Sequence, residues 1–385
     1  MKIHMCMELC GPICVSSRIY GAINISPISS QDSKAKLNTM KIQHSFPLYC
    51  SLFLLFLATN ITLISPSHGA LGKCNPSDYK ALMNIKKSLN NPYHLVSWVP
   101  NTDCCKWHGL ACDPETNRIN ELNLFEGDIS GQIPSSLGDL PYLENLSFRE
   151  FKKIKGSIPP SITKLKHLYF LDLSHLSLSG PIPNFFNQLT SLSFLYLSSN
   201  QFSGSIPPNL SELKYIKTID LSNNRLTGSV PETFGTFPGP IIPQLFLSHN
   251  QLSGPIPKSL GALDYWKIDF SWNNFDGDAS VLFNASHSVV THMNLSWNQF
   301  EFDLSNVKFP KNLMVLDLSH NKIFGTIPEE IKGLQLLYGL NVSYNSLCGK
   351  IPHGGKMGIF DNTVYLHNKC LCGPPVTTGC KKELE

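Results

Sequence analysis

The feature that most constrains this chain is a motif that recurs at a short and nearly constant interval through its central part. Two clear copies are LSFLYLSSNQFSGSIPPNLSEL (192–213) and LMVLDLSHNKIFGTIPEEIKGL (313–334), and both follow the template LxxLxLxxNxLxGxIPxxLxxL. Ten copies fill most of residues 117–352. The second leucine position of each copy is held by Leu122, Leu146, Leu171, Leu195, Ile219, Leu245, Ile268, Met293, Leu316 and Leu340. A fixed period of about two dozen residues indicates a repeat solenoid.

Elementary physical chemistry predicts how each copy of the motif folds. The two apolar residues of LxL are separated by one residue, so both point to one face of a short strand and enter the core. The Gly permits a turn, and the Pro after Ile limits pairing and begins the return path. The Asn three residues after LxL turns the chain, and its amide can satisfy backbone groups in that turn. Seven copies carry this residue, namely Asn200, Asn224, Asn250, Asn273, Asn298, Asn321 and Asn345.

No single copy can bury its own apolar face, so the copies must stack to be stable. Stacking buries one continuous core, and the strands then form a parallel sheet that lines a curved surface. We therefore predict an α/β leucine-rich-repeat solenoid of about ten repeats over residues 117–352. The exposed positions of xxLxLxx are its candidate binding surface, whereas the repeated leucines are expected to be core and nothing more.

The two ends of such a solenoid need protection from solvent, and the flanking segments 71–116 and 353–385 are predicted to be caps. Asn75 is the expected N-cap of a helix over residues 75–89, with Pro76 at its first position. The apolar face of this helix is expected to comprise Leu82, Met83, Ile85 and Leu89.

Residues 1–70 read as a leader. The run LYCSLFLLFLA (48–58) follows Lys41 and His44 and precedes the small and polar residues SPSHGA, which is the layout of a secretory signal peptide. This run is shorter than the roughly 20 apolar residues that span a bilayer. We expect the signal peptide to occupy 40–70, starting at Met40, and residues 1–39 to be an extension of the gene model. The alternative is a genuinely long leader.

Eight cysteines remain after the leader, in two groups of four: Cys74, Cys104, Cys105, Cys112, and Cys348, Cys370, Cys372, Cys380. An even count in an exported chain predicts disulfides that staple the two caps. Neighbours Cys104 and Cys105 are poor partners, as are Cys370 and Cys372, but spacing does not choose among the other pairings. A zinc site is a weaker alternative because suitably spaced histidines are missing.

Charge argues against one class of partner. The chain has 31 basic and 28 acidic residues; the segment 1–70 holds five of the former and two of the latter, which leaves 26 of each sign in 71–385. A nucleic-acid-binding chain normally has a basic excess. No phosphate-binding loop, serine-hydrolase elbow or metal-type histidine cluster is found, so we expect neither an enzyme nor a cofactor or metal site.

The sequence resembles the plant polygalacturonase-inhibiting proteins over about residues 72–380. The resemblance is carried by CNPSDYKALMNIKKSLNNPYHLVSW and TDCCKWHGLACDPETNRIN before the repeats, GQIPSSLGDLPYLENL, GDASVLF, and LNVSYNSLCGKIPHGG with NKCLCGPP at the end. It departs from the pattern at Leu176, where Asn is expected, in the basic stretch FKKIKG (151–156), and in EFDLSNVKF, which lacks GxIP.

This resemblance implies a right-handed curved solenoid with an extra sheet around the LxGxIP segments. It also implies the disulfides Cys74–Cys104, Cys105–Cys112, Cys348–Cys370 and Cys372–Cys380. The expected location is the plant cell wall, and the expected partner of a monomeric inhibitor is an endopolygalacturonase of a pathogen. Pectin is a further expected ligand. No membrane span is expected in the mature chain.

The candidate binding residues are the exposed positions of successive strands: Glu121, Asn123, Glu144, Arg149, Asp172, His175, Tyr196, Lys217, Asp220, Phe246, His249, Lys267, Asp269, Trp272, His292, Trp297, Asp317 and Tyr344. Asp172, Asp220, Asp269 and Asp317 share the position between the two core leucines. Because the motif period is nearly constant, they are expected in one row with one aspartate per repeat. Such a row would attract a basic surface such as the cleft of an enzyme that cleaves polygalacturonate. The alternative is that each Asp only hydrogen-bonds its neighbours along the sheet. Trp272 and Trp297 could anchor a partner.

N-glycosylation sequons occur at Asn145, Asn209, Asn284, Asn294 and Asn341. The first, fourth and fifth fall on the strand face, where a glycan would narrow the binding surface. Asn209 and Asn284 are therefore the sites expected to be compatible with an unobstructed binder.

Three other functions compete with inhibition of pectin-degrading enzymes. A soluble receptor-type module that binds a peptide or receptor partner in the wall is the main alternative, because many plant receptors use similar repeats. Ice binding would favour regular exposed rows of Thr or Asn, which these mixed strand faces lack. An enzyme is the least favoured class.

Overall fold

The computed structural model describes residues 74–380 of the chain. The predicted extension (1–39) and signal peptide (40–70) lie outside the described residues. In the part described, no helix is both long enough and apolar enough to cross a membrane.

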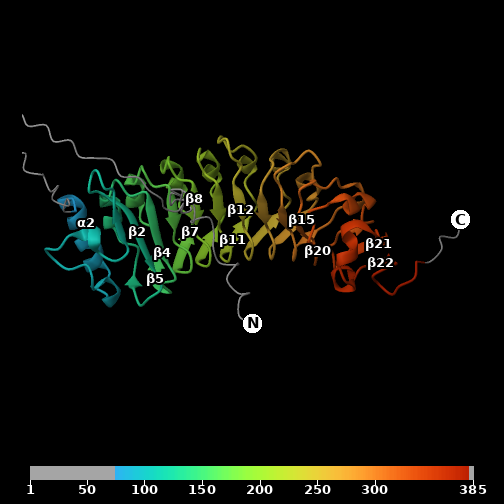
Figure 1. The fold of residues 1–385 in the computed structure, drawn as a ribbon, viewed down its shortest axis with the longest axis horizontal. Coiled ribbons are helices and arrows are strands. Elements are labelled where there is room, and N and C mark those ends of the chain that lie inside the picture. Colours follow the sequence, from blue (N-terminus) through green and yellow to red (C-terminus); the bar gives the residue numbers. More distant parts are fainter. Residues whose placement is uncertain (1–73, 381–385) are drawn as a thin grey trace, which may run out of the picture. The chain divides into compact units, whose positions relative to one another are not determined.

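The repeats stack into a solenoid whose largest sheet has 11 strands (Figure 1). Its first strand, β1 (Leu110–Cys112), pairs antiparallel with β2 (Ile119–Phe125), and all later pairings are parallel. One strand comes from each of the ten predicted repeats. After β2 these strands are β4 (Asn145–Arg149), β6 (Phe170–Asp172), β8 (Phe194–Tyr196), β10 (Thr218–Asp220), β12 (Gln244–Phe246), β14 (Lys267–Asp269), β16 (His292–Asn294), β18 (Val315–Asp317) and β20 (Gly339–Asn341).

A second row of strands follows the LxGxIP segments. Eight of them form one sheet: β3 (Ser130–Gly131), β5 (Lys153–Gly156), β7 (Ser177–Pro181), β9 (Gln201–Gly204), β11 (Arg225–Gly228), β13 (Gln251–Gly254), β15 (Asn274–Gly277) and β17 (Gln299–Phe300). Three more form a separate sheet: β19 (Phe324–Gly325), β21 (Ser346–Lys350) and β22 (Cys370–Cys372). The row breaks at EFDLSNVKF, the repeat without GxIP, where one bridge from Asp303 to Phe324 remains.

Short 3₁₀ helices form the return path of each repeat, and most begin directly after a proline. They are η3 (Ser135–Asp139), η4 (Pro160–Lys164), η5 (Asn184–Gln188), η6 (Pro208–Glu212), η7 (Glu232–Gly235), η8 (Lys258–Ala262), η9 (Ser280–Leu282), η10 (Leu304–Asn306) and η11 (Glu329–Gly333). Each of them buries at least one apolar side chain against the strands. The repeated leucines lie in one continuous core, as predicted.

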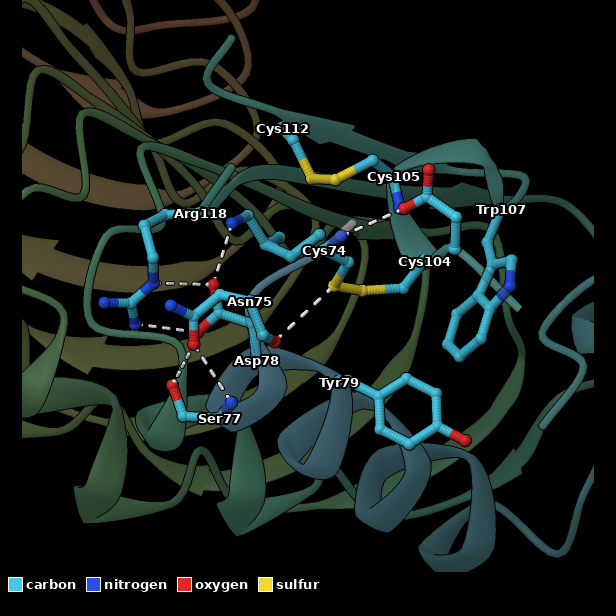
Figure 2. Close-up of a disulfide and its surroundings, with 12 residues drawn as sticks. Cys74, Asn75, Ser77, Asp78, Tyr79, Cys104, Cys105, Trp107, Cys112 and Arg118 are labelled. Carbon is cyan, nitrogen blue, oxygen red and sulfur yellow. Dashed lines mark hydrogen bonds and ion pairs between the residues drawn. A yellow bond between two sulfur atoms is a disulfide. The ribbon is translucent and has the colours of Figure 1, made fainter. Parts of the chain in front are cut away.

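The N-terminal cap is built on α2 (Pro76–Ser88), and the Asn75 side chain caps it by accepting a hydrogen bond from the Ser77 N–H. Met83 is only partly buried, unlike the other predicted core positions of this helix. The disulfide Cys74–Cys104 joins the residue before the N-cap of α2 to η2 (Cys104–Lys106), and Cys105–Cys112 joins η2 to β1 (Figure 2). In the chain, η1 (Tyr93–Leu95) lies between α2 and η2.

The C-terminal cap continues the stack past β20. It contains η12 (Gly355–Ile359) and η13 (Asn362–Tyr365), and burial raises the pKa of Tyr365 to about 12. The disulfides Cys348–Cys370 and Cys372–Cys380 hold this segment. The four pairings of the two caps are the ones that the family resemblance implies.

A ladder of asparagines runs along the turns that follow the large sheet. The Asn273 amide nitrogen donates to the carbonyls of Leu247, Phe270 and Ser271 at 2.9–3.2 Å, and its oxygen accepts from the Leu252 N–H at 3.0 Å. The amide therefore joins two repeats, beyond the single turn that the sequence predicts. The seven predicted asparagines all act this way, and Asn368 in the C-terminal cap extends the ladder.

Candidate protein-binding face

The 11-stranded sheet brings the candidate binding residues to one face. Each of them falls before, between or after the two core leucines of its repeat, and we call these three groups rows. The first row includes residues one position (Lys267) and two positions (Lys217) before the first core residue. Their side chains are exposed or half-buried with one exception. Asp172 is only 7% exposed, so the prediction that it lines the accessible surface is wrong.

The middle row differs from the prediction. The strand register places Asp172 opposite Tyr196, which lies opposite Asp220, and the row then continues through Phe246 and Asp269. The aspartates therefore occupy every second strand, and neutral side chains separate them. The aspartates do lie in one row, as predicted, but the expected spacing of one aspartate per repeat is wrong.

Each of these aspartates bonds within its own repeat, to a serine just beyond the end of the strand. The Asp269 carboxylate accepts from the Ser271 hydroxyl at 2.7 Å and from the Ser271 N–H at 3.1 Å. Asp172, Asp220 and Asp317 make the same pair of bonds to the serine two residues on. The partner is thus a local serine and not a neighbour along the sheet. Only one oxygen of each carboxylate takes part, so a half-exposed aspartate keeps an oxygen for a cationic partner.

In the central repeats the residues before the core leucines are basic and aromatic. The Lys217 ammonium lies 5.5 Å from the ring centre of Tyr169 and 5.7 Å from that of Phe194. Lys267 lies over the Trp266 ring at 5.0 Å. Burial, and secondarily the Lys267 charge, lowers the pKa of His292 on the neighbouring strand. In the central repeats the basic side chains therefore precede the core leucines and the aspartates lie between them, whereas Glu121 and Glu144 precede the core leucines in the first two repeats.

The third row ends in a continuous stack of six aromatic rings, which we call the aromatic ribbon: His249, Trp272, Trp297, His320, Tyr344 and His367. Ring centres of the Trp272–Trp297 pair are 4.1 Å apart, and those of Trp297–His320 are 3.7 Å apart. Three further contacts, at 5.2, 4.1 and 4.1 Å, connect the remaining rings. All five pairs are nearly parallel, with angles of 12–23° between the ring planes.

The backbone of the aromatic ribbon is left-handed, with φ of 53–58° at all six residues. Large side chains rarely adopt this conformation. It is held here by hydrogen bonds to the next repeat, such as the Trp272 N–H to the Ser296 carbonyl at 3.0 Å and the Trp297 N–H to the Ser319 carbonyl at 2.9 Å. The fold imposes this backbone, and it does not require aromatic side chains.

Four members of the aromatic ribbon, His249, Trp272, Trp297 and Tyr344, were predicted from the sequence as binding residues, whereas His320 and His367 were not. The signal is present in the sequence, because each of the six residues directly precedes a ladder asparagine. What the sequence did not reveal was that these positions lie close enough for the rings to stack.

The asparagine side chains of the sequons differ in the hydrogen bonds that they make. Asn294 and Asn341 lie in the middle row, where their side-chain oxygens accept from Ser296 and Ser343 just as the aspartates do. The Asn209 amide nitrogen donates to the Asn184 carbonyl of the preceding repeat. Asn284 lies in a turn beyond η9, and its side-chain oxygen accepts from Ser286.

Within residues 74–380 no group of three His, Cys, Asp or Glu side chains is arranged to hold a metal ion. What the side chains of the three rows offer a partner is charge, hydrogen bonding and aromatic contact.

Comparisons with known proteins agree with this architecture. Residues 75–113 match the leucine-rich-repeat N-terminal domain, and residues 167–189, 191–213, 215–237, 244–263 and 312–334 match the leucine-rich repeat. A polygalacturonase inhibitor of Vitis vinifera is 57% identical over 89% of this chain and 100% of its own length. Polygalacturonase inhibitor 1 of Arabidopsis thaliana is 58% identical over 85% of this chain and 97% of its own. The crystal structure of a plant ice-binding protein, 46% identical, matches 81% of this chain and 100% of its own with a TM-score of 0.78.

Proposed function

This chain belongs to the polygalacturonase-inhibitor family of leucine-rich-repeat proteins, and we propose that it binds and inhibits endopolygalacturonases of plant pathogens. The support from the comparisons is the identity of 57–58% over nearly the whole length of two named inhibitors. The chain is not an enzyme; it is a binding protein. The receptor-type alternative is not favoured, because the PEPR1 receptor structure shares 25% identity and the chain covers only 49% of it.

One structural observation carries the proposal, namely the accessible face of the 11-stranded sheet. Lys217, Lys267 and His292 precede the core leucines of the central repeats, and half-exposed carboxylates with an unused oxygen lie between those leucines. The C-terminal cap packs beside β20 as a continuation of the stack. A target enzyme with a basic substrate cleft would meet the Asp220, Asp269 and Asp317 carboxylates there.

Inhibition by this face needs no covalent step. A protein bound across the mouth of a substrate cleft excludes a polymeric substrate by its volume alone. Surface complementarity then determines which enzyme is inhibited. The exposed strand side chains, which differ from repeat to repeat, provide this complementarity, whereas the recurring leucines only form the core. The partner-binding residues are those of the three rows, without the buried Asp172.

We also propose secretion to the plant cell wall, which the leader pattern and the inhibitor relatives support. Glycans at Asn284 would leave the binding face open. Asn209 is less suited, because its amide nitrogen is engaged by the neighbouring repeat. Glycopeptide mass spectrometry of the secreted protein should find Asn284 occupied, and occupancy of Asn294 or Asn341 would contradict an open face.

The direct test is a reducing-sugar assay with a panel of fungal and insect endopolygalacturonases. We expect at least one enzyme to be inhibited in a dose-dependent way, with the protein secreted from plant cells and its disulfides intact. Binding is measured in parallel by surface plasmon resonance. Failure to bind or inhibit any enzyme of the panel would contradict the proposed function.

A further inference from the structure

The aromatic ribbon is unusual because its residues combine a left-handed backbone with large side chains, most of which are exposed. Trp272, Trp297 and Tyr344 are 41–45% exposed although each lies in a tight stack. A smaller residue suits the same backbone: Asn223 has φ of 54° and makes the equivalent N–H bond to the Ser248 carbonyl. Burial does not explain large aromatic rings at such positions, and strain at an exposed site is a pointer to function.

The geometry of the stack determines which part of each ring a partner can touch. Both faces of Trp297 are covered, one by Trp272 and the other by His320. Tyr344 is covered in the same way by His320 and His367. The exposed area of these rings therefore belongs to their edges, which carry the positive end of the ring quadrupole and the indole N–H and phenol O–H groups.

This geometry disfavours two kinds of ligand. The C–H groups of a sugar ring and the planes of nucleic-acid bases both pack on the negative faces of aromatic rings, and both faces of the four inner rings of the ribbon are occupied. Ring edges instead accept aromatic faces, aliphatic side chains and carbonyl oxygens, which are groups that a folded protein surface presents together.

Carboxylates beside the aromatic ribbon further restrict the kind of protein surface that can bind there. Asp269 and Asp317 lie three residues before Trp272 and His320, in the same repeats, and each has a carboxylate oxygen outside its serine bonds. A second copy of this chain would bring like charges together on this face. A partner with lysine or arginine beside an apolar ridge is complementary to both rows.

We propose that the aromatic ribbon is the anchor by which the C-terminal half of this face holds a protein partner, with Trp272 and Trp297 at its centre. The partner surface is apolar or aromatic and is flanked by basic side chains. This inference rests on the proposed function, since the partner meant is the inhibited endopolygalacturonase. Trp residues in such central positions commonly dominate binding energy.

The test compares two double variants at equivalent backbone positions. Trp272→Asn with Trp297→Asn removes the centre of the ribbon, and Glu150→Asn with Ser199→Asn makes the matched change in the N-terminal half. Asn is compatible with the left-handed backbone at all four positions. Affinity is measured by surface plasmon resonance against an endopolygalacturonase that the wild type inhibits and, separately, against oligogalacturonides.

We expect the ribbon variant to lose at least about 30-fold in affinity for the enzyme, as for a central hot spot. The matched variant should stay within about threefold of the wild type, and oligogalacturonide binding should be the same for all three proteins. Equal losses in the two variants, or enzyme affinity that is retained while oligogalacturonide binding is lost, would overturn the assignment. If the wild type binds no enzyme of the panel, the proposed function fails together with the anchor; if the ribbon variant binds the enzyme as the wild type does, the anchor alone fails.

A footprinting experiment on the wild-type complex tests the anchor without any variant, so its result does not depend on how the variants fold. Hydroxyl-radical oxidation followed by mass spectrometry reads each tryptophan separately. Bound enzyme should lower the oxidation of Trp272 and Trp297 several-fold. Unchanged oxidation of both in the complex would refute the anchor.

Discussion

The two halves of the solenoid share one backbone at the position before the ladder asparagine, but they carry different side chains there. In the N-terminal half these residues are Glu126, Glu150, His175, Ser199 and Asn223, with φ of 49–65°. In the C-terminal half they are the six rings of the aromatic ribbon. The backbone N–H of Ser199 and that of Trp297 each donate to the next repeat at 2.9 Å. The fold thus fixes the main chain in both halves and leaves the side chain free for recognition.

The halves also differ in what joins their repeats. The ladder position holds Gly127, Phe151 and Leu176 in the first three repeats, and the latter two side chains are buried in the core. From Asn200 onward the ladder consists of hydrogen-bonded amides. The N-terminal end therefore depends on apolar packing and on its cap, whereas the rest depends in addition on amides that connect consecutive repeats.

The largest expected effect comes from the ion pair that fastens the N-terminal cap. Asp78 is 1% exposed and accepts from the Arg118 guanidinium at 2.7 and 2.9 Å and from the Ile119 N–H at 2.9 Å (Figure 2). We expect Asp78→Asn to cost about 3 kcal/mol, because it leaves a partly buried guanidinium without its charge partner. Urea denaturation measures the loss.

Hydrogen exchange then shows which backbone amides lose protection in the Asp78→Asn variant. Because a solenoid repeat contacts only its neighbours, protection should fall over the N-terminal cap and first repeats and persist at the aromatic ribbon. The control is Asp139→Asn, whose exposed bridge to Lys164 at 3.2 Å should be worth less than about 1 kcal/mol. A uniform loss of protection in both halves would mean that they unfold as one unit.

A somewhat smaller loss is expected from breaking the amide ladder beneath the aromatic ribbon. Asn273→Ala leaves the Leu252 N–H and two or three buried carbonyls without partners, at a cost of about 2–3 kcal/mol. The neighbouring Asn274 is exposed, so Asn274→Ala should change stability by less than about 0.5 kcal/mol. Thermal unfolding of the two variants measures this difference, and equal melting temperatures would show that the ladder is not a stabilising element.

The sequence was sufficient to predict the solenoid. The repeat length, the strand residues that face the core and the capping helix all follow from local patterns such as LxL and Asn75-Pro76. The pairing of Cys74 with Cys104 came from family resemblance and not from spacing. Two features could not be predicted because they depend on distances between repeats. One is the contact of Trp297 with the rings of the two neighbouring repeats, and the other is the burial of Asp172.

The smallest effect concerns the pH response of the aromatic ribbon. Burial lowers the pKa of His320 from its ordinary 6.5, and nearby His367 lowers it further, while Asp317 opposes the shift. A lowered pKa means that the folded state prefers the neutral ring. Its contribution to stability is therefore complete above pH 6.5 and is lost as the pH falls through the lowered pKa.

The melting temperature of the wild type should consequently fall more between pH 8 and pH 5 than that of His320→Asn, which keeps the left-handed backbone but does not titrate. The N-terminal half supplies the control, because Ser199 occupies the equivalent backbone position outside the ring stack. Ser199→Asn should leave the wild-type pH response unchanged. If His320→Asn follows the wild-type curve as well, the rings stacked on His320 tolerate its protonation, and the two halves respond to acid alike.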